Sequence, residues 1–570
     1  MLDPLPERRH LVRTARIASI PFTRPGRKRG EKLKMKRIVG RLFATLCLGA
    51  ILPGGAMAAD GGKCPRPAAG SDVKRPPDLY STNGILNVSF DYWTALDAEG
   101  RTLFCFVTPD GIESPTLHVN PGDTINIALT NRLPIIPGGP SEIVSAGSKV
   151  CGSPAMTLTS VNMHFHGTNT SPKCHSDEVI RTLVNSGQTF TYTLKIPKDE
   201  PPGLYWYHPH IHGISSVSVQ GGASGAIVVE GIQNIQPVVA GLPERILIVR
   251  DQARVAHHVK GIPTPNWDVS LNYIPVDYPD YNPAVIKMKR GTQEFWRVAN
   301  ASANTIIDLQ LLYDGKAQPL QIVGLDGVPT GSHDGKHQGT IITQKNILLP
   351  PAGRAEFIVA APTRGIEDAR LVTRKIHGGP ASDSNPARPL AIIQDMKGAP
   401  GLRRMPERTG PPNPQRFENL MTAKVTAKRK LYFYEVPSRG PAAEPVKFFI
   451  VVDGDVAHLY DPNNPPDITT MRGAVEDWTI QNRSNEVHEF HIHQIHFLLL
   501  EKNGVPVPKK QRQFYDTIQV PYWDGVGKYP SVKVRMDFRG PTIGDFVYHC
   551  HILDHEDLGM MAIIRVKPKN

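Results

Sequence analysis

Four His-x-His pairs place the strongest constraint on how this chain of 570 residues can fold. The pairs are His164/His166, His208/His210, His491/His493 and His549/His551. Successive side chains on a β-strand point to opposite faces, so residues two apart project together. Strand-forming residues such as Phe165, Trp206, Phe490 and Val547 flank the pairs. Each pair is therefore expected to lie on a strand and to aim two imidazoles at one point.

A cysteine stands between the two histidines of the last pair, in the segment FVYHCHILDHEDLGMM. If this segment is extended, the sulfur of Cys550 leaves the strand on the face opposite to His549 and His551. By the same parity, His488 faces away from the histidine pair that follows it. The cysteine is therefore expected to connect two separate metal sites through the backbone.

The ligand types of the second site indicate copper. Neutral imidazoles, one thiolate and a weak thioether form the ligand set of a blue copper electron-transfer site. Cys550, His488 and His555, with Met560 as axial ligand, match this set. Zinc is the alternative metal, but a structural zinc site takes four ligands, commonly with paired cysteines. The ten histidines, one cysteine and one methionine of these motifs exceed such a site.

The four motifs, in this order, resemble the copper signatures of the multicopper oxidases, which include laccases, ascorbate oxidases, ferroxidases and bilirubin oxidases. The resemblance covers roughly residues 80 to 568. It implies that His164 and His491 hold a type 2 copper. It also implies that a type 3 copper pair is held by His166, His208, His210, His493, His549 and His551. In HEFHIHQIHF, Glu489 and Gln494 stand where many members have Pro and Gly; this departure leaves the ligands intact and bears on access to the site.

A diverged repeat runs through the chain in the segments NPGDTINIALTNRL, KRGTQEFWRVANAS and MRGAVEDWTIQNRS. Each segment has a Gly and an Asn nine residues apart, typical of a turn followed by an alternating strand. The pairs are Gly122/Asn131, Gly291/Asn300 and Gly473/Asn482. The spacing of about 170 to 180 residues is that of whole domains. Short strands with Gly/Pro-rich turns predict an all-β chain of three Greek-key β-sandwiches, which the resemblance narrows to cupredoxin-like domains.

We place the three domains at residues 70–233, 234–396 and 421–570, with a Pro-, Gly- and Arg-rich linker at 397–420. The first domain is expected to supply ligands of the trinuclear copper cluster, and the third to supply the type 1 ligands and the remaining trinuclear ligands. The middle domain has no His-x-His pair and is expected to hold the outer two face to face. Its histidines, for which surface or structural roles are expected, are His257, His258, His333, His337 and His377.

The N-terminal segment accounts for most of the positive charge. Residues 1–58 hold 13 Lys and Arg against three Asp and Glu, whereas the whole chain has a formal net charge of +12. The remainder is nearly neutral, so the charge gives no indication of nucleic-acid binding. From Met35, a basic start, a short apolar run and small residues near Ala58 predict a secretory signal. We therefore expect a protein exported to the periplasm or secreted, monomeric, and without a membrane span in its mature form.

Cysteine usage agrees with export. With Cys47 in the signal segment and Cys550 assigned to copper, four cysteines remain. An even number in an exported protein favours two disulfides, for which three pairings are possible. Proximity in the sequence favours Cys64–Cys105 and Cys151–Cys174 over the other two pairings.

The resemblance implies an oxidoreductase with four copper ions, namely one type 1, one type 2 and a type 3 pair, and with dioxygen as electron acceptor. Electrons would pass from a reducing substrate through Cys550 to His549 and His551. Reducing oxygen to water also consumes protons. Asp177 and Glu556 match acidic positions used for proton delivery in similar enzymes, and the alternative is that both are ordinary solvated acids.

Two histidines and the reducing substrate remain to be assigned. His212 and His496 are expected to have structural or supporting roles. The first choice of substrate is a phenol or an aromatic amine, as in laccases, because the 13 methionines form no Met-rich run of the kind found in copper-handling members. A metallo-oxidase of cuprous or ferrous ion is the alternative. A copper-binding structural or coat protein is the non-enzymatic alternative.

Overall fold

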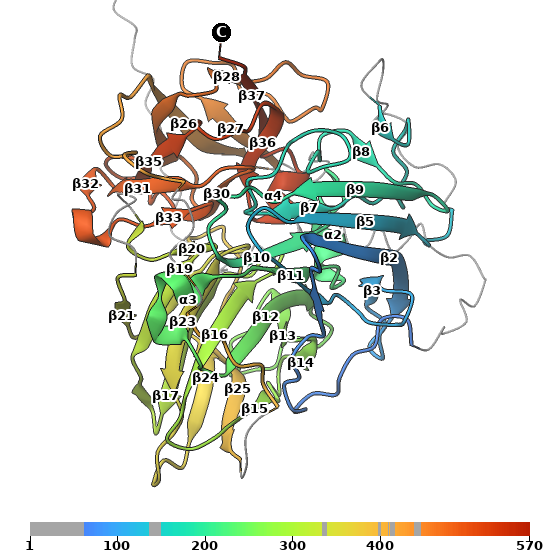
Figure 1. Cartoon of the computed structure of the whole chain (residues 1–570), viewed down its shortest axis with the longest axis vertical. Helices are drawn as coiled ribbons and strands as arrows, with labels where there is room; N and C mark the ends of the chain where they lie inside the picture. Colours follow the sequence, from blue (N-terminus) through green and yellow to red (C-terminus); the bar gives the residue numbers. More distant parts are fainter. Residues whose placement is uncertain are drawn as a thin grey trace, which may run out of the picture. The chain divides into compact units, whose positions relative to one another are not determined.

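The computed structural model describes residues 62–135, 150–332, 339–396, 401–408, 410, 416–437 and 446–569. The predicted signal segment, His333, His337 and much of the predicted linker lie outside these residues. Six large sheets form three pairs, each pair built from one continuous stretch of chain, and the three groups of strands are separated by colour in Figure 1. The predicted all-β class with three sandwiches is confirmed.

The first sandwich packs the sheet β3-β2-β5-β9 against the sheet β1-β4-β11-β10-β7, with a small β6-β8 pair beside them. Side chains alternate between buried and exposed along β2, β5 and β9, so these strands have one face in the core. Its strands are β1 (Asp78–Tyr80), β2 (Ile85–Leu96), β3 (Thr102–Val107), β4 (Thr116–Val119), β5 (Thr124–Asn131), β6 (Cys151–Gly152), β7 (His164–His166), β8 (Thr182–Leu183), β9 (Thr189–Lys195), β10 (Gly203–His208) and β11 (Gly225–Val229).

The middle sandwich packs the sheet β14-β13-β12-β16-β23-β19-β20 against β15-β25-β24-β17-β18, with β21 and β22 on side branches. Its strands are β12 (Glu244–Ala253), β13 (Trp267–Leu271), β14 (Ile274–Val276), β15 (Ala284–Met288), β16 (Gln293–Asn300), β17 (Ile307–Tyr313), β18 (Lys316–Ala317), β19 (Leu320–Leu325), β20 (Val328–Pro329), β21 (Ile342–Gln344), β22 (Ile347–Leu349), β23 (Arg354–Ala360), β24 (Ala369–Thr373) and β25 (Arg388–Asp395).

The third sandwich packs the sheet β27-β26-β29-β35-β31-β32 against β28-β37-β36-β30-β34, with β33 beside β31. Its strands are β26 (Ala427–Val436), β27 (Lys447–Val452), β28 (Ile468–Met471), β29 (Val475–Asn482), β30 (His488–Ile492), β31 (Phe497–Lys502), β32 (Val505–Pro506), β33 (Phe514–Tyr515), β34 (Thr517–Val520), β35 (Ser531–Asp537), β36 (Gly544–Cys550) and β37 (Met561–Lys567).

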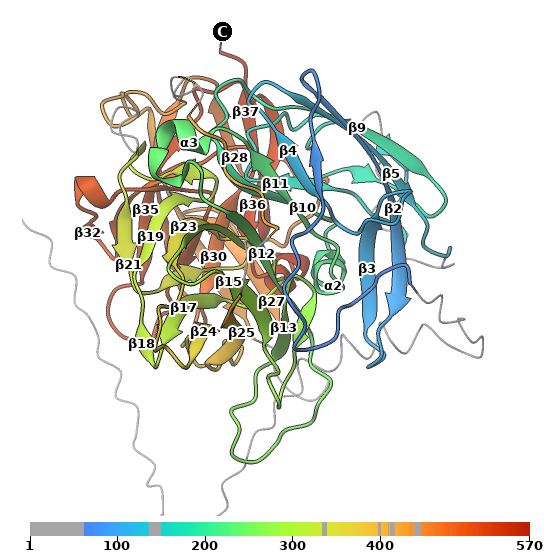
Figure 2. The ribbon, with the colours of Figure 1, turned by 60° about the horizontal axis from the view of Figure 1, so that its bottom comes forward.

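Helices are few and short in the described residues. They are α2 (Ser215–Gln220), α3 (Ile232–Ile235), α4 (Leu553–Asp557) and the 3-10 turns η1 (Pro237–Val239) and η3 (Lys509–Gln511). Among the described helices, none is both long and apolar enough to cross a membrane. Figure 2 shows α2 lying between strands of the first and middle sandwiches, where it contacts both β3 and β12.

The predicted repeat forms the same structure three times. Its Gly has a positive φ in each copy, and its Asn ends β5, β16 and β29. Asn131, Asn300 and Asn482 are fully buried, and each side-chain amide donates to two backbone carbonyls. Each side-chain oxygen also accepts the N–H two residues later. The repeat is therefore a corner that recurs in all three sandwiches and joins the end of a strand to neighbouring loops.

Both favoured disulfides are present. Cys64 is bonded to Cys105 and Cys151 to Cys174, which leaves Cys550 as a buried free thiol. The bond between Cys64 and Cys105 ties the N-terminal end of the described chain to β3. The bond between Cys151 and Cys174 closes a loop that contains the strand β7.

A buried ionic cluster connects the first two sandwiches to the segment that follows them. The two ring nitrogens of His118 lie 2.7 Å from Glu230 Oε1 and 3.0 Å from Asp78 Oδ1. Arg403 lies 2.7 Å from Glu230 and 3.2 Å from Glu244 on β12. Burial alone would raise the pKa of Glu230, but the bonds from His118 and Arg403 lower it to about 2.

Glu230→Gln is expected to lower the free energy of unfolding by about 3 kcal/mol at pH 6, since each unit of pKa shift is worth about 1.4 kcal/mol. A carboxylate with a lowered pKa stabilises the fold fully above its ordinary pKa of 4.5 and loses this effect as the pH falls towards 2. The difference in Tm between parent and variant should therefore shrink between pH 4.5 and pH 2.5. Glu99→Gln, at a weak surface pair, is the control; an equal difference at all pH values would contradict the assignment.

Candidate metal centre

The four histidine pairs lie on, or just beyond the C-terminal ends of, two sets of neighbouring strands. Both members of the first pair are on β7, whereas His210, His493 and His551 come after the last residues of β10, β30 and β36, so only the first pair lies wholly on a strand as expected. In the first sandwich β7 is paired with β10, which places His164 opposite His208. In the third sandwich β30 is paired with β36, which places His491 opposite His549. Along β10, β30 and most of β36 no side chain is exposed, so both faces of these strands are covered. Alternation is therefore not visible in the burial of these strands and is judged from the contacts that their side chains make.

Side chains from the first and third sandwiches interleave at one point. The rings of His164 and His493 stack with centroids 3.8 Å apart, and those of His166 and His491 with centroids 4.1 Å apart. His549 Nε2 lies 3.2 Å from His493 Nε2 and from a ring nitrogen of the first sandwich, His210 Nε2. The donor atoms form three groups, namely His164/His166/His491, His166/His208/His551 and His210/His493/His549. The last two groups divide the six histidines of the implied type 3 pair into two sets of three.

The ring nitrogens of this cluster are available as metal ligands. All eight histidines are at most 1% exposed, and burial lowers their pKa values, to about 3 for His208 and about 4 for His549. The imidazoles are therefore neutral. Buried ring nitrogens without a hydrogen-bond partner occur on six of the eight, namely His164, His166, His208, His491, His493 and His551. Buried unpaired acceptors are costly, and a metal ion satisfies them.

Hydrogen bonds on the opposite ring nitrogens fix several of these imidazoles. Asp177 lies 2.9 Å from His164 Nδ1, and Asp516 Oδ1 lies 3.1 Å from His166 Nε2. The Nδ1–H of His208 and that of His491 donate to backbone carbonyls, each at 2.8 Å. Such bonds set the tautomer and leave the other nitrogen free as a ligand.

The second cluster lies on the other side of β36. His488 Nδ1 and His555 Nδ1 are 3.1 Å apart, and the sulfur of Cys550 is 3.6 Å and 3.8 Å from them. His555 is carried by α4, which follows β36 directly, and it retains 8% exposure. Two imidazoles and one thiol in this arrangement fit the copper ligand set predicted from the sequence.

The two adjacent methionines separate as strand alternation predicts. Met560 is fully buried in the same core cluster as Cys550, and its carbonyl accepts the Cys550 N–H at 3.0 Å. Met561 packs instead with Val547 and Tyr460 on the opposite face. Met560 is thus the methionine that shares a core with the second cluster, and its role as axial ligand remains a prediction.

The two predicted acids are buried beside the histidine cluster. Asp177 accepts bonds from the Phe165 N–H and from Gln494 Nε2, and burial raises its pKa to about 8. Glu556 lies in α4 with its carboxylate 3.6 Å from His212 Nδ1, and burial raises its pKa to about 8. Both carboxyls therefore hold a proton near neutral pH, so neither is an ordinary solvated acid.

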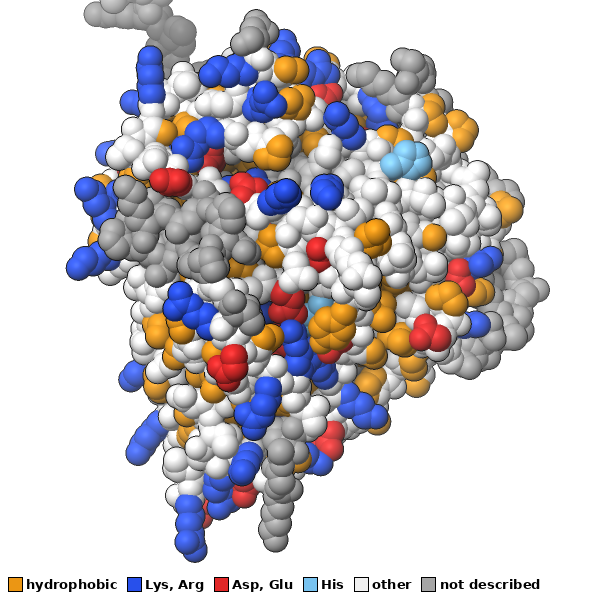
Figure 3. Space-filling view, in the orientation of Figure 1, with side chains coloured by type: hydrophobic (Ala, Val, Ile, Leu, Met, Phe, Trp, Pro, Cys, Tyr) orange, Lys and Arg blue, Asp and Glu red, His pale blue; other side chains and the backbone are white. Residues whose placement is uncertain are grey.

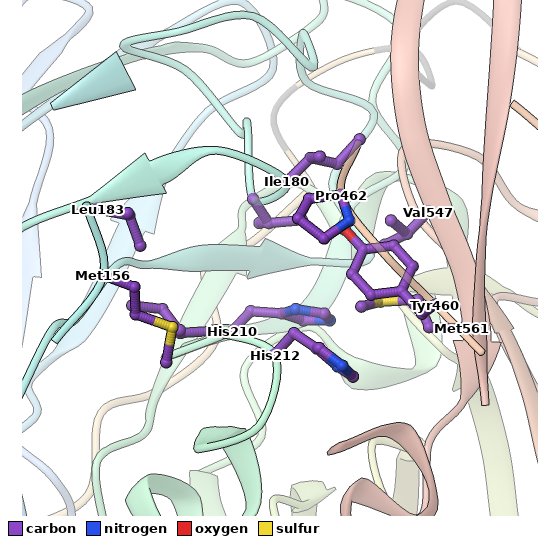
Figure 4. Close-up of a pocket in the computed structure, with 11 residues that line it drawn as sticks. Met156, Ile180, Leu183, His210, His212, Tyr460, Pro462, Val547 and Met561 are labelled. Carbon is purple, nitrogen blue, oxygen red and sulfur yellow. The ribbon is translucent and has the colours of Figure 1, made fainter. Parts of the chain in front are cut away.

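A cavity of about 20 Å³, enough for a water molecule, adjoins this region. Figure 4 shows His210 and His212 along one side, with Tyr460 and Met561 of the third sandwich opposite. His496, by contrast, is enclosed, with Nε2 donating to the Asp326 carbonyl at 2.8 Å. The histidine clusters are internal. On the face drawn in Figure 3, histidine is accordingly visible only as isolated spots.

Two residues of this site, Asp516 and Arg354, are not among those predicted from the sequence. Asp516 comes just before β34, and its carboxylate receives two bonds from Arg354 of the middle sandwich, at 2.7 Å and 2.5 Å. Because Asp516 also contacts His166, the middle domain reaches the histidine cluster through Arg354. Neither residue belongs to a motif with a recognisable spacing, and they are 162 positions apart.

Gly167 shows how closely this contact is packed. A Cβ there would lie 2.5 Å from Arg354 Nη2 and 2.7 Å from Asp516 Oδ2, at a φ of +85°. Gly167→Ala is therefore expected to destabilise the protein by about 3 kcal/mol, from backbone strain plus overpacking. Gly187→Ala is the matched control, since it has a φ of +81° and nothing within 4 Å of the added Cβ. Thermal unfolding of both variants provides the measurement. Equal losses in Tm for Gly167→Ala and Gly187→Ala would contradict this packing.

Two segments of the chain match known multicopper oxidase domains. Models of multicopper oxidase domains match residues 156–234 and 442–570, the segments that carry the four histidine pairs. A multicopper oxidase of Staphylococcus haemolyticus is 23% identical over 458 residues, covering 79% of this chain and 81% of the relative. A laccase of Bacillus subtilis (strain 168) is 23% identical, covering 64% of this chain and 71% of the laccase.

Solved structures share the fold. The chain superposes on a multicopper oxidase from Campylobacter jejuni, described as a metallo-oxidase, with a TM-score of 0.63 and 22% identity. This match covers 88% of the chain and 96% of that structure. Both matched family segments contain the buried clusters described above, and the likeness extends over all three sandwiches, which are cupredoxin-like. Residues 156–234 and 442–570 therefore contain multicopper oxidase domains, and the chain as a whole has the multicopper oxidase fold.

Proposed function

We propose that this copper-dependent oxidoreductase couples one-electron oxidations of a reducing substrate to the four-electron reduction of dioxygen to water. One observation supports this above all. Cys550 faces the second cluster, while its two sequence neighbours His549 and His551 face the first. The cluster that contains the Cys550 thiol is therefore connected to the cluster of eight imidazoles by the backbone on each side of Cys550, and each connection spans one residue.

We assign the residues as the resemblance implies. Type 1 copper would be held by His488, Cys550 and His555, with Met560 as axial ligand. Type 2 copper would be held by His164 and His491. The type 3 pair would be held by His166, His208, His210, His493, His549 and His551. Copper held at these positions would supply the one-electron chemistry and the reduction of dioxygen.

The protein's own groups would supply protons for this reaction. Asp177 bonds the type 2 ligand His164 and is protonated near neutral pH because it is buried. Glu556 lies close to His212, which lines the small cavity together with the type 3 ligand His210. We propose that Asp177 and Glu556 hold and deliver protons for the reaction.

Three further assignments extend this proposal. Domain boundaries near residues 233 and 420 fit the sheets, because no sheet crosses either position. The two disulfides support export to an oxidising compartment, periplasmic or extracellular. The protein is proposed to act as a monomer without nucleic-acid partners.

A phenol or an aromatic amine is the proposed substrate. Of His488, Cys550 and His555, only His555 keeps accessible surface, at 8%. One of the relatives of this chain is a laccase. Phe448 stacks on His555 with ring centroids 4.2 Å apart and is itself buried, so it holds the imidazole in place from the core side. The preference for an organic donor rests on the lack of a Met-rich run and on the similarity to a laccase.

Carboxylates at the same edge favour a second candidate, a metallo-oxidase of cuprous or ferrous ion. Glu435 Oε1 lies 3.0 Å from His488 Nε2, and Glu486 Oε1 lies 3.5 Å from His555 Nε2. Negative charge beside the electron entry residues attracts a cationic reductant. The similar structure from Campylobacter jejuni is described as a metallo-oxidase.

Cys550→Ser is expected to abolish both the intense blue colour and substrate turnover, because it removes the thiol sulfur that lies 3.6 Å and 3.8 Å from the two histidines of the second cluster. Copper held by the eight histidines should remain, since none of them is altered. Copper counting and absorption spectra of the purified variant provide the measurement. Loss of nearly all copper would contradict two separable sites.

The substrate class can be decided by oxygen uptake with a phenol, Cu(I) and Fe(II) as alternative donors. Glu486→Gln should raise KM for Fe(II) or Cu(I) about tenfold if a metal ion is the substrate, and leave KM for a neutral phenol within about twofold. Glu501→Gln, at a surface pair with Lys533, is the control and should change neither. No oxygen uptake with any donor would contradict the proposed function and favour a structural copper protein.

A further inference from the structure

The backbone of Glu489 is directed at the sulfur of Cys550. The Glu489 N–H donates to Cys550 Sγ with the nitrogen and sulfur 3.4 Å apart. The Glu489 carbonyl accepts the His551 N–H at 2.7 Å. Both backbone groups therefore face β36, which lies beside β30 in Figure 1. The Glu489 N–H does not take part in the ladder to β34, because the backbone groups of successive residues point alternately to the two neighbouring strands.

This hydrogen bond depends on what residue occupies position 489. Any residue except proline supplies a backbone N–H at this position. Proline has no N–H and could not make the bond.

We propose that the Glu489 amide raises the reduction potential of the type 1 copper, so that this protein accepts electrons from poorer donors than it would with proline at this position. The proposal rests on the assignment of Cys550 as a copper ligand. Reduction of the site adds electron density to the thiolate, and an N–H dipole aimed at the sulfur stabilises the electron-rich state more. Hydrogen bonds to ligand sulfur are a general control of metal-site potentials.

The side chain of Glu489 can be separated from its amide. Its Oε1 accepts a bond from Gln519 Nε2 at 2.9 Å, on the neighbouring strand β34. An alanine at 489 removes this bond but keeps the N–H. A proline removes both the side-chain bond and the N–H, and leaves the ladder to β34 and the carbonyl bond to His551 in place. The difference between the two variants isolates the amide.

The experiment compares Glu489→Pro with Glu489→Ala in the copper-loaded full chain, by redox titration followed through the thiolate-to-copper absorption. Glu489→Pro should lower the equilibrium constant for electron uptake from a fixed mediator about tenfold relative to Glu489→Ala, which is about 59 mV for one electron. Equal potentials in the two variants would overturn the proposal. Copper content and thermal unfolding establish that each variant is folded and loaded.

A second measurement does not require the proline variant to fold. Pulsed EPR of the parent, labelled with ¹⁵N only in glutamate, should show a ¹⁵N coupling to the oxidised type 1 copper through the N–H···S contact. This coupling should vanish in labelled Glu489→Ala, whose amide at 489 is unlabelled. Its absence in the parent would overturn the proposal. Neither measurement needs turnover, so a protein that binds copper but consumes no oxygen would contradict the proposed function while leaving this test intact.

Discussion

The meeting of the first and third sandwiches at eight neutral imidazoles is the interaction on which the site depends. Each sandwich supplies two pairs, and stacked rings such as His164 on His493 cross the boundary between them. Six of the eight histidines carry a buried nitrogen without a hydrogen-bond partner. These nitrogens are costly in the protein alone and are satisfied by metal ions, so metal binding and the docking of the two sandwiches stabilise each other.

The repeated Gly and Asn corner fixes segments with different roles in the third and middle sandwiches. In the third sandwich, Asn482 binds the Glu486 and Val520 carbonyls and so fixes the segment that leads to His488. In the middle sandwich, the backbone of Asn300 bonds that of Ala352 and Gly353, just before Arg354. The same corner thus positions a proposed copper ligand in one domain and an arginine in another.

The sequence was most informative where side-chain spacing encodes geometry. Strand parity correctly separated Cys550 from His549 and His551, and Met560 from Met561, because alternation is a local property of extended chain. The pairing of the cysteines followed from proximity. Asp516, Arg354 and the cluster around His118 could not be predicted in this way, since each joins single residues from distant strands and has no periodic pattern. Their partners are set by how the sandwiches pack, which local spacing does not describe.

Asp516 shows why the middle domain is more than a spacer. Its carboxylate contacts His166 of the first sandwich, its backbone carbonyl accepts the Nδ1–H of His491 in the third, and Arg354 of the middle sandwich holds the carboxylate at both oxygens. Burial beside neutral imidazoles would by itself raise the pKa of Asp516. The Arg354 guanidinium outweighs this effect and keeps the pKa of Asp516 below its usual value. The arginine of a domain without metal ligands therefore maintains a negative charge next to the proposed copper ligands of the other two. Because one buried residue contacts all three sandwiches, a change in the packing of any one of them is felt at the histidine cluster.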